Sequence, residues 1–474
     1  MTRINTNISS MIAQGRLRGN TNDLQTRLER LATGLRINRG KDDPAGLIAS
    51  EILRSEIGAI GQAIDNSQRA INVISTAEGA INESSRLLVD LRALIVNTAN
   101  EGALSQEEIE ANQLEIDALL ASIDRIANTT SFGSKKLLNG SLSYSLSSVN
   151  TAALESVSVF SARVPEGGQQ NVVVQVTGSA ETGQLQITGA TTSAATIEIT
   201  GNLGSEILAF ASGATIGGIA TSINAVSDTT GVSATASGGV LYINSREFGS
   251  DQFVTVKTLS GTFVQDAQYV AGANPVTDLG EDATVLVNGQ VADTAGIRVD
   301  IRTGSLNARF FLSSSFGTQT TSATSFQITG GGSLFQLGPD VSPTSQVSVA
   351  LNSISSGNLG NSVIGFLDSI RSGGANEVKG GNFVSAQRIV EEAINQVATF
   401  RGRLGSLQKN QIETNINSQQ IALENVSASE STIRDADIAE EVSALTRSQI
   451  LFQSTQNTLQ IANSLPQAVL GLLG

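Results

Sequence analysis

The 474-residue chain contains neither cysteine nor histidine. Without cysteine it cannot form disulfides, thiolate nucleophiles or cysteine-ligated zinc and iron–sulfur sites. Without histidine it lacks the commonest general base and the commonest metal ligand. No G-x-x-x-x-G-K-[ST] loop occurs, and no G-x-G-x-x-G element opens a helix. We therefore expect no enzymatic activity, no metal and no cofactor.

Positive charge is also scarce, because 29 Lys and Arg stand against 43 Asp and Glu, for a net charge of −14. Nucleic-acid binding depends on cationic contacts with phosphate, so we expect no nucleic-acid partner. No apolar run reaches the roughly 18 residues that a membrane helix needs, so we expect no membrane partner. The opening MTRINTNISS lacks the apolar segment of a secretory signal, and export would use another route.

Proline and aromatic residues are rare, and there is no tryptophan. The six prolines are Pro44, Pro165, Pro275, Pro339, Pro343 and Pro466. Proline breaks a helix interior, so the proline-free stretches 45–164 and 344–465 allow long uninterrupted helices.

The N-terminal zone predicts three helices. The first is expected to end near Gly40 and carries a stripe of leucines on one face: Leu17, Leu24, Leu28, Leu31 and Leu35. Asp42 or Asp43 then caps a second helix, with Pro44 in its first turn. Its apolar stripe at heptad positions comprises Ile57, Ile60, Ile64, Ile71, Ile74, Ile81, Leu88 and Ile95. Ser105 with Glu108 is a capping box that opens a third helix, and glycines after Thr129 indicate a hairpin.

The C-terminal zone repeats this pattern. Apolar residues from Ile394 through Leu404 and then from Ile412 to Ile433 predict another long helical seam. A second follows with strict steps of seven, at Ile438, Leu445, Phe452 and Leu459, and Pro466 precedes an apolar tail, residues 469–474. An ordinary helical bundle would give similar stripes.

Charge favours pairing of the two ends. Residues 1–45 carry eight Arg and Lys against four Asp and Glu, whereas residues 430–474 carry two Arg against five acids. Exposed ion pairs contribute little each, so charge would select the partner while the aliphatic seam supplies affinity. Two unrelated solvated faces would show the same charges. The predicted self-assembly seam comprises Leu17, Leu24, Leu28, Leu31, Leu35, Ile438, Leu445, Phe452 and Leu459.

The middle of the chain, residues 166–380, has a different composition. It is rich in Gly, Ser and Thr and alternates apolar residues with period two, as in Val172-Val174-Val176 and Val285-Val287, which predicts strands. Helical spacing from Gly217 to Ser227 predicts one short helix on the sheets. We therefore predict an α+β multidomain protein whose two ends form long α-helical coiled coils, with a β-rich domain inserted between them.

Two stretches resemble a known family. Leu28–Ser50 (LERLATGLRINRGKDDPAGLIAS) and Asn417–Asp437 (NSQQIALENVSASESTIRDAD), with the sequence that follows to the end, are similar to the N- and C-terminal signatures of bacterial flagellins. Ile207–Ser245 resembles a repeat found inside flagellin and hook-associated inserts, and Ser325–Val341 resembles a segment that precedes the C-terminal helices. The two terminal signatures are highly specific.

The resemblance implies a structural subunit that self-assembles into the extracellular flagellar filament after export, unfolded, through the flagellar type III apparatus. It implies an inner coiled-coil core from 1–42 and 437–474, an outer helical layer with a β-hairpin from 43–165 and 381–436, and a surface-exposed β-rich insert at 166–380, in one or two subdomains. Implied partners are copies of the chain, cap and hook-junction proteins and an export chaperone.

Two alternatives accompany this interpretation. A hook–filament junction protein shares both signatures, but residues 41–50 and the NSLPQAVLGLL ending favour flagellin. A secreted hydrolase on a flagellar scaffold would use the zinc motif H-E-x-x-H, which a chain without histidine cannot form.

The resemblance also implies a contact with the Toll-like flagellin receptor. The matching segment is VDLRALIV, residues 89–96, in which Arg92 and Leu94 keep their places, and Glu115 matches the acidic position. Asp90 replaces the first arginine of the family pattern. A misplaced charge in an interface weakens affinity, so the departure predicts a weak agonist. Leu88, Leu91 and Ile95 of the same stretch equally fit a purely structural helix seam.

Overall fold

The computed structural model describes residues 6–164, 168–188, 194–261, 263 and 274–471. The last three residues of the predicted apolar tail lie outside this range. The chain forms two compact units. The first comprises Met1–Gln68, Leu337–Val341 and Ile412–Gly474, and the second comprises Arg69–Gln336 and Ser342–Gln411.

Long helices occupy both ends of the chain, as predicted. They are α1 Ile8–Thr33, α2 Pro44–Thr98, α3 Gln106–Thr129, α7 Phe383–Leu407, α8 Thr414–Arg434 and α9 Ile438–Gly471. Short helices are α4 Ile216–Ala225, α5 Ser227–Thr230, α6 Ser314–Gly317 and the 3₁₀ turns Leu367–Ile370 and Val378–Gly380. With the strands described below, they confirm the α+β class.

Local signals set the helix ends. α1 ends at Thr33, so the predicted end near Gly40 is wrong. Gly34 stops it by adopting a left-handed backbone, with φ of 74°, while its N–H donates to the carbonyl of Arg30 at 2.8 Å. At the start of α2, Asp43 accepts the N–H of Gly46 at 2.9 Å, which selects Asp43 as the cap. The capping box of Ser105 and Glu108 is confirmed.

The buried face of α2 follows a strict 3–4 spacing that combines Ile and Leu with Ala, Ser and Thr. Its positions are Ile60, Ala63, Ser67, Ala70, Ile74, Ala77, Ile81, Ser84, Leu88, Leu91, Ile95 and Thr98. Of the predicted stripe, Ile57, Ile64 and Ile71 lie half-buried beside this face. The small residues let a neighbouring helix approach closely. The buried face of α2 is therefore wider than the isoleucines alone indicate.

The predicted seam before residue 434 lies on two helices. A π-helical segment, Gln408–Glu413, separates α7 from α8. Val390, Val397 and Leu404 are buried at steps of seven, but the next buried residue, Ile412, comes eight residues later. A π turn holds an extra residue, so it brings Ile412 back to the buried face.

Twenty-two strands make up the rest of the described fold. In the helical zone they are β1 Ser131–Phe132, β2 Lys135–Lys136, β3 Tyr144–Ser147 and β4 Leu154–Ala162. The first half of the middle zone contains β5 Gln170–Gly178, β6 Gln184–Thr188, β7 Ala195–Gly201, β8 Ser205–Phe210, β9 Val232–Ser237, β10 Val240–Ser245, β11 Phe253–Ser260 and β12 Val276–Leu279. The second half contains β13 Thr284–Val287, β14 Gln290–Val291, β15 Asp293–Ala295, β16 Arg298–Arg302, β17 Leu306–Leu312, β18 Ala323–Gly331, β19 Ser333–Gln336, β20 Gln346–Val349, β21 Gly360–Asn361 and β22 Gly365–Phe366.

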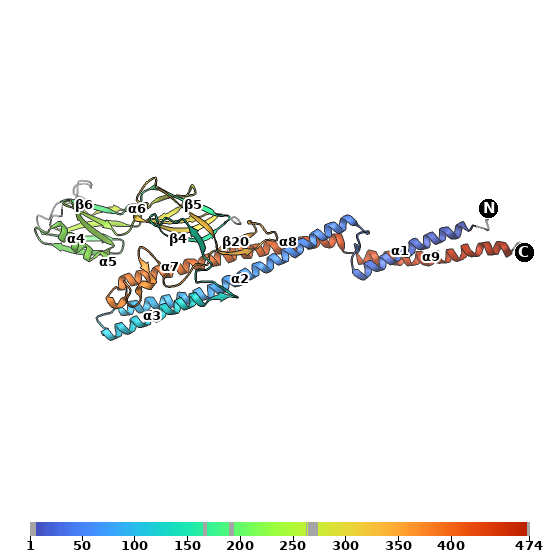
Figure 1. Ribbon diagram of the computed structural model, residues 1–474, viewed down its shortest axis with the longest axis horizontal. Helices are drawn as coiled ribbons and strands as arrows, with labels where there is room; N and C mark the ends of the chain where they lie inside the picture. The colour runs from blue at the N-terminus through green and yellow to red at the C-terminus, as the bar shows by residue number, and fades with distance from the viewer. Residues whose placement is uncertain (1–5, 165–167, 189–193, 262, 264–273, 472–474) are drawn as a thin grey trace. The chain divides into compact units, whose positions relative to one another are not determined.

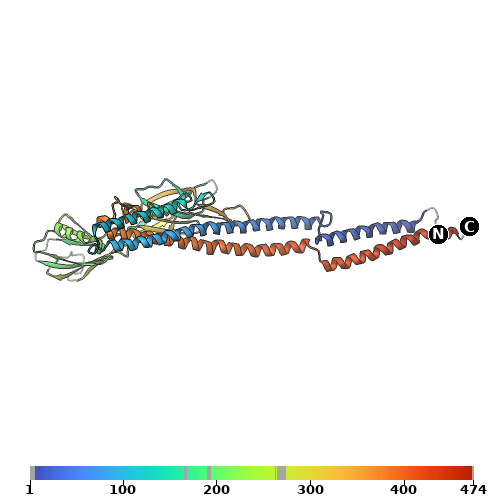
Figure 2. The same cartoon turned by 90° about the horizontal axis from the view of Figure 1, so that it is seen from below.

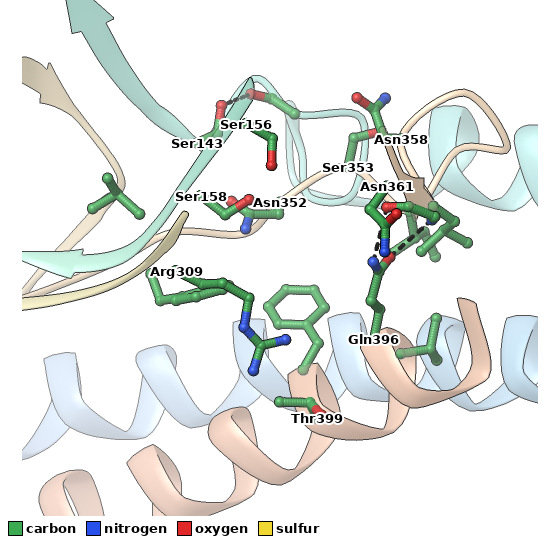
Figure 3. A pocket seen from close by; sticks show the side chains of 18 of the residues that line it. Ser143, Ser156, Ser158, Arg309, Asn352, Ser353, Asn358, Asn361, Gln396 and Thr399 are labelled. Atoms are coloured by element: carbon green, nitrogen blue, oxygen red, sulfur yellow. Dashed lines mark hydrogen bonds between the residues drawn. The ribbon is translucent and has the colours of Figure 1, made fainter. Parts of the chain in front are cut away.

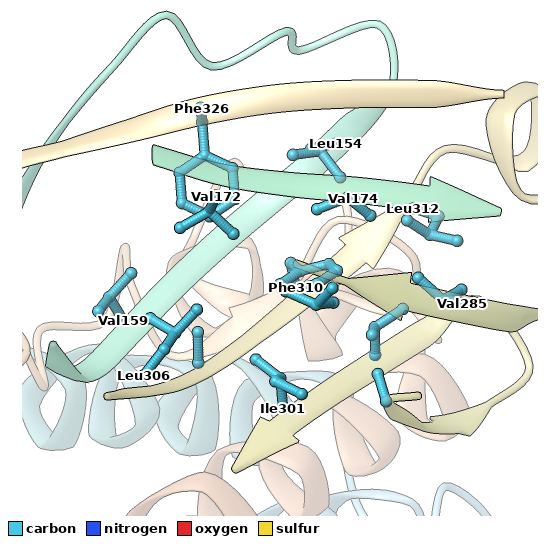
Figure 4. Packing of buried hydrophobic residues seen from close by; sticks show 14 of the residues in the cluster. Leu154, Val159, Val172, Val174, Val285, Ile301, Leu306, Phe310, Leu312 and Phe326 are labelled. Carbon is cyan, nitrogen blue, oxygen red and sulfur yellow. The ribbon is translucent and has the colours of Figure 1, made fainter. Parts of the chain in front are cut away.

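Two larger antiparallel sheets form a sandwich in the second unit. One has the order β14-β13-β5-β18-β3 and the other β15-β16-β17-β4. Alternate residues of each strand point inward, and Phe310 and Phe326, both fully buried, meet edge to face at the centre with ring centroids 6.4 Å apart (Figure 4). Only β1 and β2 form the hairpin predicted after Thr129, since β3 joins this sandwich.

A smaller module has its own apolar core. It contains the sheets β12-β11-β7-β8 and β6-β10-β9, with α4 packed against them through Ile219 and Ile223, so the predicted short helix is confirmed. The chain enters and leaves this module side by side, because Glu181 and Glu281 exchange two backbone hydrogen bonds of 2.9 Å each. The described residues of the middle zone therefore include two separate hydrophobic clusters.

Candidate functional site

The two ends of the chain meet in an antiparallel helix pair. As the α1 numbers rise, their α9 partners fall: Asn7 donates to the carbonyl of Ala462 at 2.7 Å, Asn20 to that of Leu451 at 3.2 Å, and Arg27 to the carboxylate of Glu441 at 3.0 Å. Figures 1 and 2 show α1 and α9 side by side in both views. This is the pairing that the stripes and charges predict.

One of the buried groups in this pair is a carboxylate. Glu441 is only 7% exposed at its side chain and accepts hydrogen bonds from Arg27 at 3.0 and 3.1 Å and from Arg30 at 3.0 Å. Burial alone would raise the pKa of Glu441, but the two arginines outweigh it and hold that pKa below its usual value. The hydrogen bond to Glu441 raises the pKa of Arg27 in turn.

Further polar contacts fix the register of α1 against α9. Asn20 donates to the hydroxyl of Thr455 at 2.6 Å, Ser448 donates to Asp23, and Ser10 donates to Asn463 at 2.7 Å. A slip of one residue would break all of them and leave Glu441 buried without a counter-charge. The sequence carries a signal for these layers, because Glu441, Ser448, Thr455 and Ala462 follow one another at steps of seven, but a search for apolar residues alone overlooks it.

The predicted seam residues surround these polar layers. Leu17, Leu24, Leu31, Leu35, Leu445, Phe452 and Leu459 are half-buried, whereas Leu28 is 48% and Ile438 51% exposed. Exposure in one subunit does not test a contact between subunits, so the assembly role of the seam stays a prediction.

A second junction of the two ends lies just beyond α1 and α8. The N–H of Arg36 donates to the carbonyl of Arg434 at 2.7 Å, its guanidinium donates to the carbonyl of Ile433, and Leu35 and Asp435 form a β-bridge. Arg434 also forms an ion pair with Glu51 at 3.0 Å. The stretches 28–50 and 417–437 that resemble family signatures therefore contact each other directly.

The predicted receptor segment lies on α2 and α3. Asp90, Arg92 and Glu115 are exposed and Leu94 is half-buried, while Arg92 forms an ion pair with Glu391 of α7 at 2.9 Å. Leu88, Leu91 and Ile95 in the same stretch are fully buried. Exposure by itself does not test receptor binding, so the receptor role of these residues stays a prediction.

Comparison with known proteins decides the family. Residues 4–143 match the bacterial flagellin N-terminal helical region, residues 387–473 the bacterial flagellin C-terminal helical region, and residues 196–246 the flagellin hook IN motif. Flagellin D of Vibrio anguillarum is 32% identical over 472 residues, covering 99% of both chains. The chain belongs to the bacterial flagellins.

Other flagellins align along their whole length. The flagellin of Bacillus subtilis (strain 168) is 27% identical and covers 99% of both chains, and the B-type flagellin of Pseudomonas aeruginosa is 28% identical with the same coverage. A solved structure of flagellar hook associated protein-3 from Legionella pneumophila covers 81% of this chain and 98% of its own, at 14% identity and a TM-score of 0.31.

The function follows from the family to which the chain belongs. The chain is a structural subunit of the bacterial flagellar filament and lies outside the cell, and the hook–filament junction alternative is not better supported. Among the described residues, no helix has the length and hydropathy to cross a membrane.

Proposed function

We propose that this flagellin polymerises through the paired helices α1 and α9, with the predicted seam at the centre of the contact. The main support for this proposal is that α1 and α9, although held in register, leave large apolar side chains exposed. On α1 these are Ile8, Met11, Ile12 and Leu28, and on α9 they are Ile438, Val442, Ile450, Leu451, Ile461 and Leu465. Exposed apolar surface of this extent on two adjacent helices is typical of a protein interface.

The apolar positions lie outside the polar layers, so the two sets have separate roles. Hydrogen bonds and the Glu441 ion pairs hold α1 on α9 within one subunit, while the uncovered isoleucines and leucines face other copies. Burial of one such side chain contributes about 1.5–3 kcal/mol. Repeated along a filament, this contribution stabilises the polymer without a metal, a cofactor or an enzymatic step.

A matched pair of substitutions tests the assembly surface. Ile12→Ser on α1 and Ile207→Ser on β8 remove isoleucines that are each 60% exposed. We expect Ile12→Ser, combined with Ile450→Ser, to prevent filament formation in concentrated salt, while Ile207→Ser polymerises normally. Sedimentation and negative-stain images measure the outcome. Long filaments from the α1 and α9 variant would refute this surface.

The three-part division follows from the same proposal. Residues 1–42 with 437–474 form the inner core, 43–165 with 381–436 the outer helical layer, and 166–380 the surface insert. The cap and hook-junction proteins would then contact the helical parts at the two ends of the filament. An export chaperone would cover the uncovered apolar side chains of α9 before export, which solubility of the subunit requires.

Recognition by the Toll-like flagellin receptor completes the proposal, with Arg92, Leu94 and Glu115 as contacts and Asp90 as the unfavourable departure. Two features support weak recognition. Asp90 adds a negative charge where the family pattern has an arginine, and Arg92 already pairs with Glu391 at 2.9 Å, so that receptor binding would compete with this ion pair.

A further inference from the structure

A cavity of about 550 Å³ lies between the β4–β17 sheet and helix α7 in the second unit. Figure 3 shows Ser156 and Ser158 of β4 and Asn352 on one side, Thr399 of α7 on the other, and the guanidinium of Arg309 between them. Its volume is within the range of about 300–1,000 Å³ typical of small-molecule sites.

The charged groups that line this cavity are both arginines, Arg309 and Arg403, and no described Asp or Glu lines it. Arg403 stacks on the ring of Phe160, 3.4 Å from its centroid. Its Nη2 atom is buried and has no hydrogen-bond partner among the described residues. Burial, together with the nearby charge of Arg309, lowers the pKa of Arg403 to about 10.

The negative charge next to the cavity does not balance the positive charge of the arginines. Asp300 lies 2.9 Å from Arg309, 3.4 Å from Arg298 and 3.9 Å from Arg403, so one buried carboxylate faces three guanidinium groups. Arg309 uses its Nε atom for this contact. An incompletely paired cation costs free energy inside a protein. The arrangement therefore leaves a positive field at the wall of the cavity that an anion would neutralise.

The uncharged lining adds free hydrogen-bonding groups. Gln396 is already committed to both backbone groups of Gly360. In contrast, no hydrogen bond to another described residue engages the side chains of Ser156, Ser158, Asn352 and Thr399. Three hydroxyls and one amide can each donate and accept. A ligand with several hydroxyl groups would match them better than an inorganic anion, which has few or no donors.

We propose that this cavity is a binding site for a small polyhydroxylated carboxylic acid, a sugar acid of the size of a uronate. Its carboxylate would lie between Arg309 and Arg403, where planar guanidinium groups match carboxylate geometry. Its hydroxyls would contact Ser156, Ser158, Asn352 and Thr399, and the apolar faces of Phe160 and Phe400 would border the sugar ring. This site is independent of the assembly surface on α1 and α9.

Calorimetric titration of the full-length monomeric subunit tests the proposal, with glucuronate, glucose and inorganic phosphate as probes. We expect glucuronate to bind with a Kd of about 1 mM or tighter, and glucose and phosphate at least tenfold more weakly. No glucuronate binding would overturn the site. Equal binding of phosphate would overturn the sugar-acid assignment, and equal binding of glucose would overturn the role of the arginines.

Substitutions locate the binding. Arg403→Gln and Arg309→Gln should each weaken glucuronate binding at least tenfold, whereas Arg86→Gln, which removes an exposed arginine of α2 outside the cavity, should leave it unchanged. Thr399→Val keeps the side-chain shape and should weaken glucuronate several-fold, which preserves the test if an arginine variant fails to fold. Unchanged affinity in Arg403→Gln and Thr399→Val would refute the placement.

Discussion

At the scale of single residues, Glu441 couples the two ends of the chain. Its carboxylate lies in the α1–α9 pair, 7% exposed, against two arginines that originate more than 400 positions earlier in the sequence. A glutamate without a counter-charge would not be buried in a helix seam, because burying an unpaired charge is costly. The ion pairs make one register of α1 and α9 much more favourable than its neighbours.

Glu441→Gln should weaken this pairing by about 1.5–3 kcal/mol at pH 7, since charged hydrogen bonds are lost and both arginines stay half-buried. Thermal depolymerisation of filaments, followed by light scattering, measures the effect. The control is Glu440→Gln, which removes the same charge from the exposed neighbour. Equal melting of the two variants would refute a special role for Glu441.

The same residue predicts a pH dependence. The pKa of Glu441 is lowered by folding, so its stabilisation is present above the unfolded value of about 4.3 and is lost as the pH falls through the lower folded value. Other carboxylates titrate in this range, but the difference between wild type and Glu441→Gln isolates this one. We expect that difference in filament stability to be large at pH 7 and to vanish once the pH has fallen below the folded pKa.

The proposed receptor contact can be tested at Asp90. Asp90→Arg restores the arginine of the family pattern and should raise activation of the Toll-like flagellin receptor by the monomer at least tenfold, since a repulsive interfacial charge becomes attractive. A receptor reporter assay measures potency. Asp65→Arg changes an exposed acid elsewhere on α2 and serves as control. A wild-type subunit as potent as strong agonists, or no gain in Asp90→Arg, would contradict the proposal.

At the scale of elements, periodicity predicted the helices well and their interruptions poorly. The leucine spacing continues to Leu35, but α1 ends at Thr33, because Gly34 adopts the left-handed conformation that most residues avoid. The eight-residue step from Leu404 to Ile412 is visible in the sequence, yet only the backbone shows that a π turn absorbs it. In both cases one residue overrides a pattern that many residues share.

Small residues account for the other difference among the elements. Five residues of the predicted α2 stripe are fully buried, namely Ile60, Ile74, Ile81, Leu88 and Ile95. Ile57, Ile64 and Ile71 are only half-buried, whereas Ala70, Ala77 and Ser84, which the stripe did not include, are fully buried. A small side chain contributes little to a hydrophobic pattern but allows close packing of helices. Burial thus followed the geometry of the interface more than the hydropathy of each residue.

At the scale of the whole molecule, the smaller module should be separable from the sandwich. Its strands between Gln184 and Leu279 surround their own core, and Glu181 and Glu281 join its entry and exit by two backbone hydrogen bonds. Replacing 184–279 with a two-residue Asn-Gly turn should therefore preserve cooperative unfolding of the rest and filament formation. A change of only about 1–2 kcal/mol is expected, because closing a short turn costs little.

Two measurements check this separation. Thermal unfolding by circular dichroism follows the shortened subunit, and electron microscopy follows its filaments. The excised segment 183–280 should unfold cooperatively by itself, because a domain is defined by its own apolar core. Loss of cooperative unfolding in both pieces would show that the loop around Phe248, which packs against the sandwich core, makes the two parts inseparable.

The sequence by itself determined the helical ends, the β-rich middle and the family, because these depend on local periodicity, on turn residues and on two specific signatures. It also excluded cysteine and histidine chemistry. Only the tertiary structure decided the antiparallel register of α1 and α9, the polar layers around Glu441 and the cavity that joins Ser156, Arg309 and Arg403. These features bring together residues that are hundreds of positions apart, and their energies arise from burial and charge geometry that no local pattern encodes.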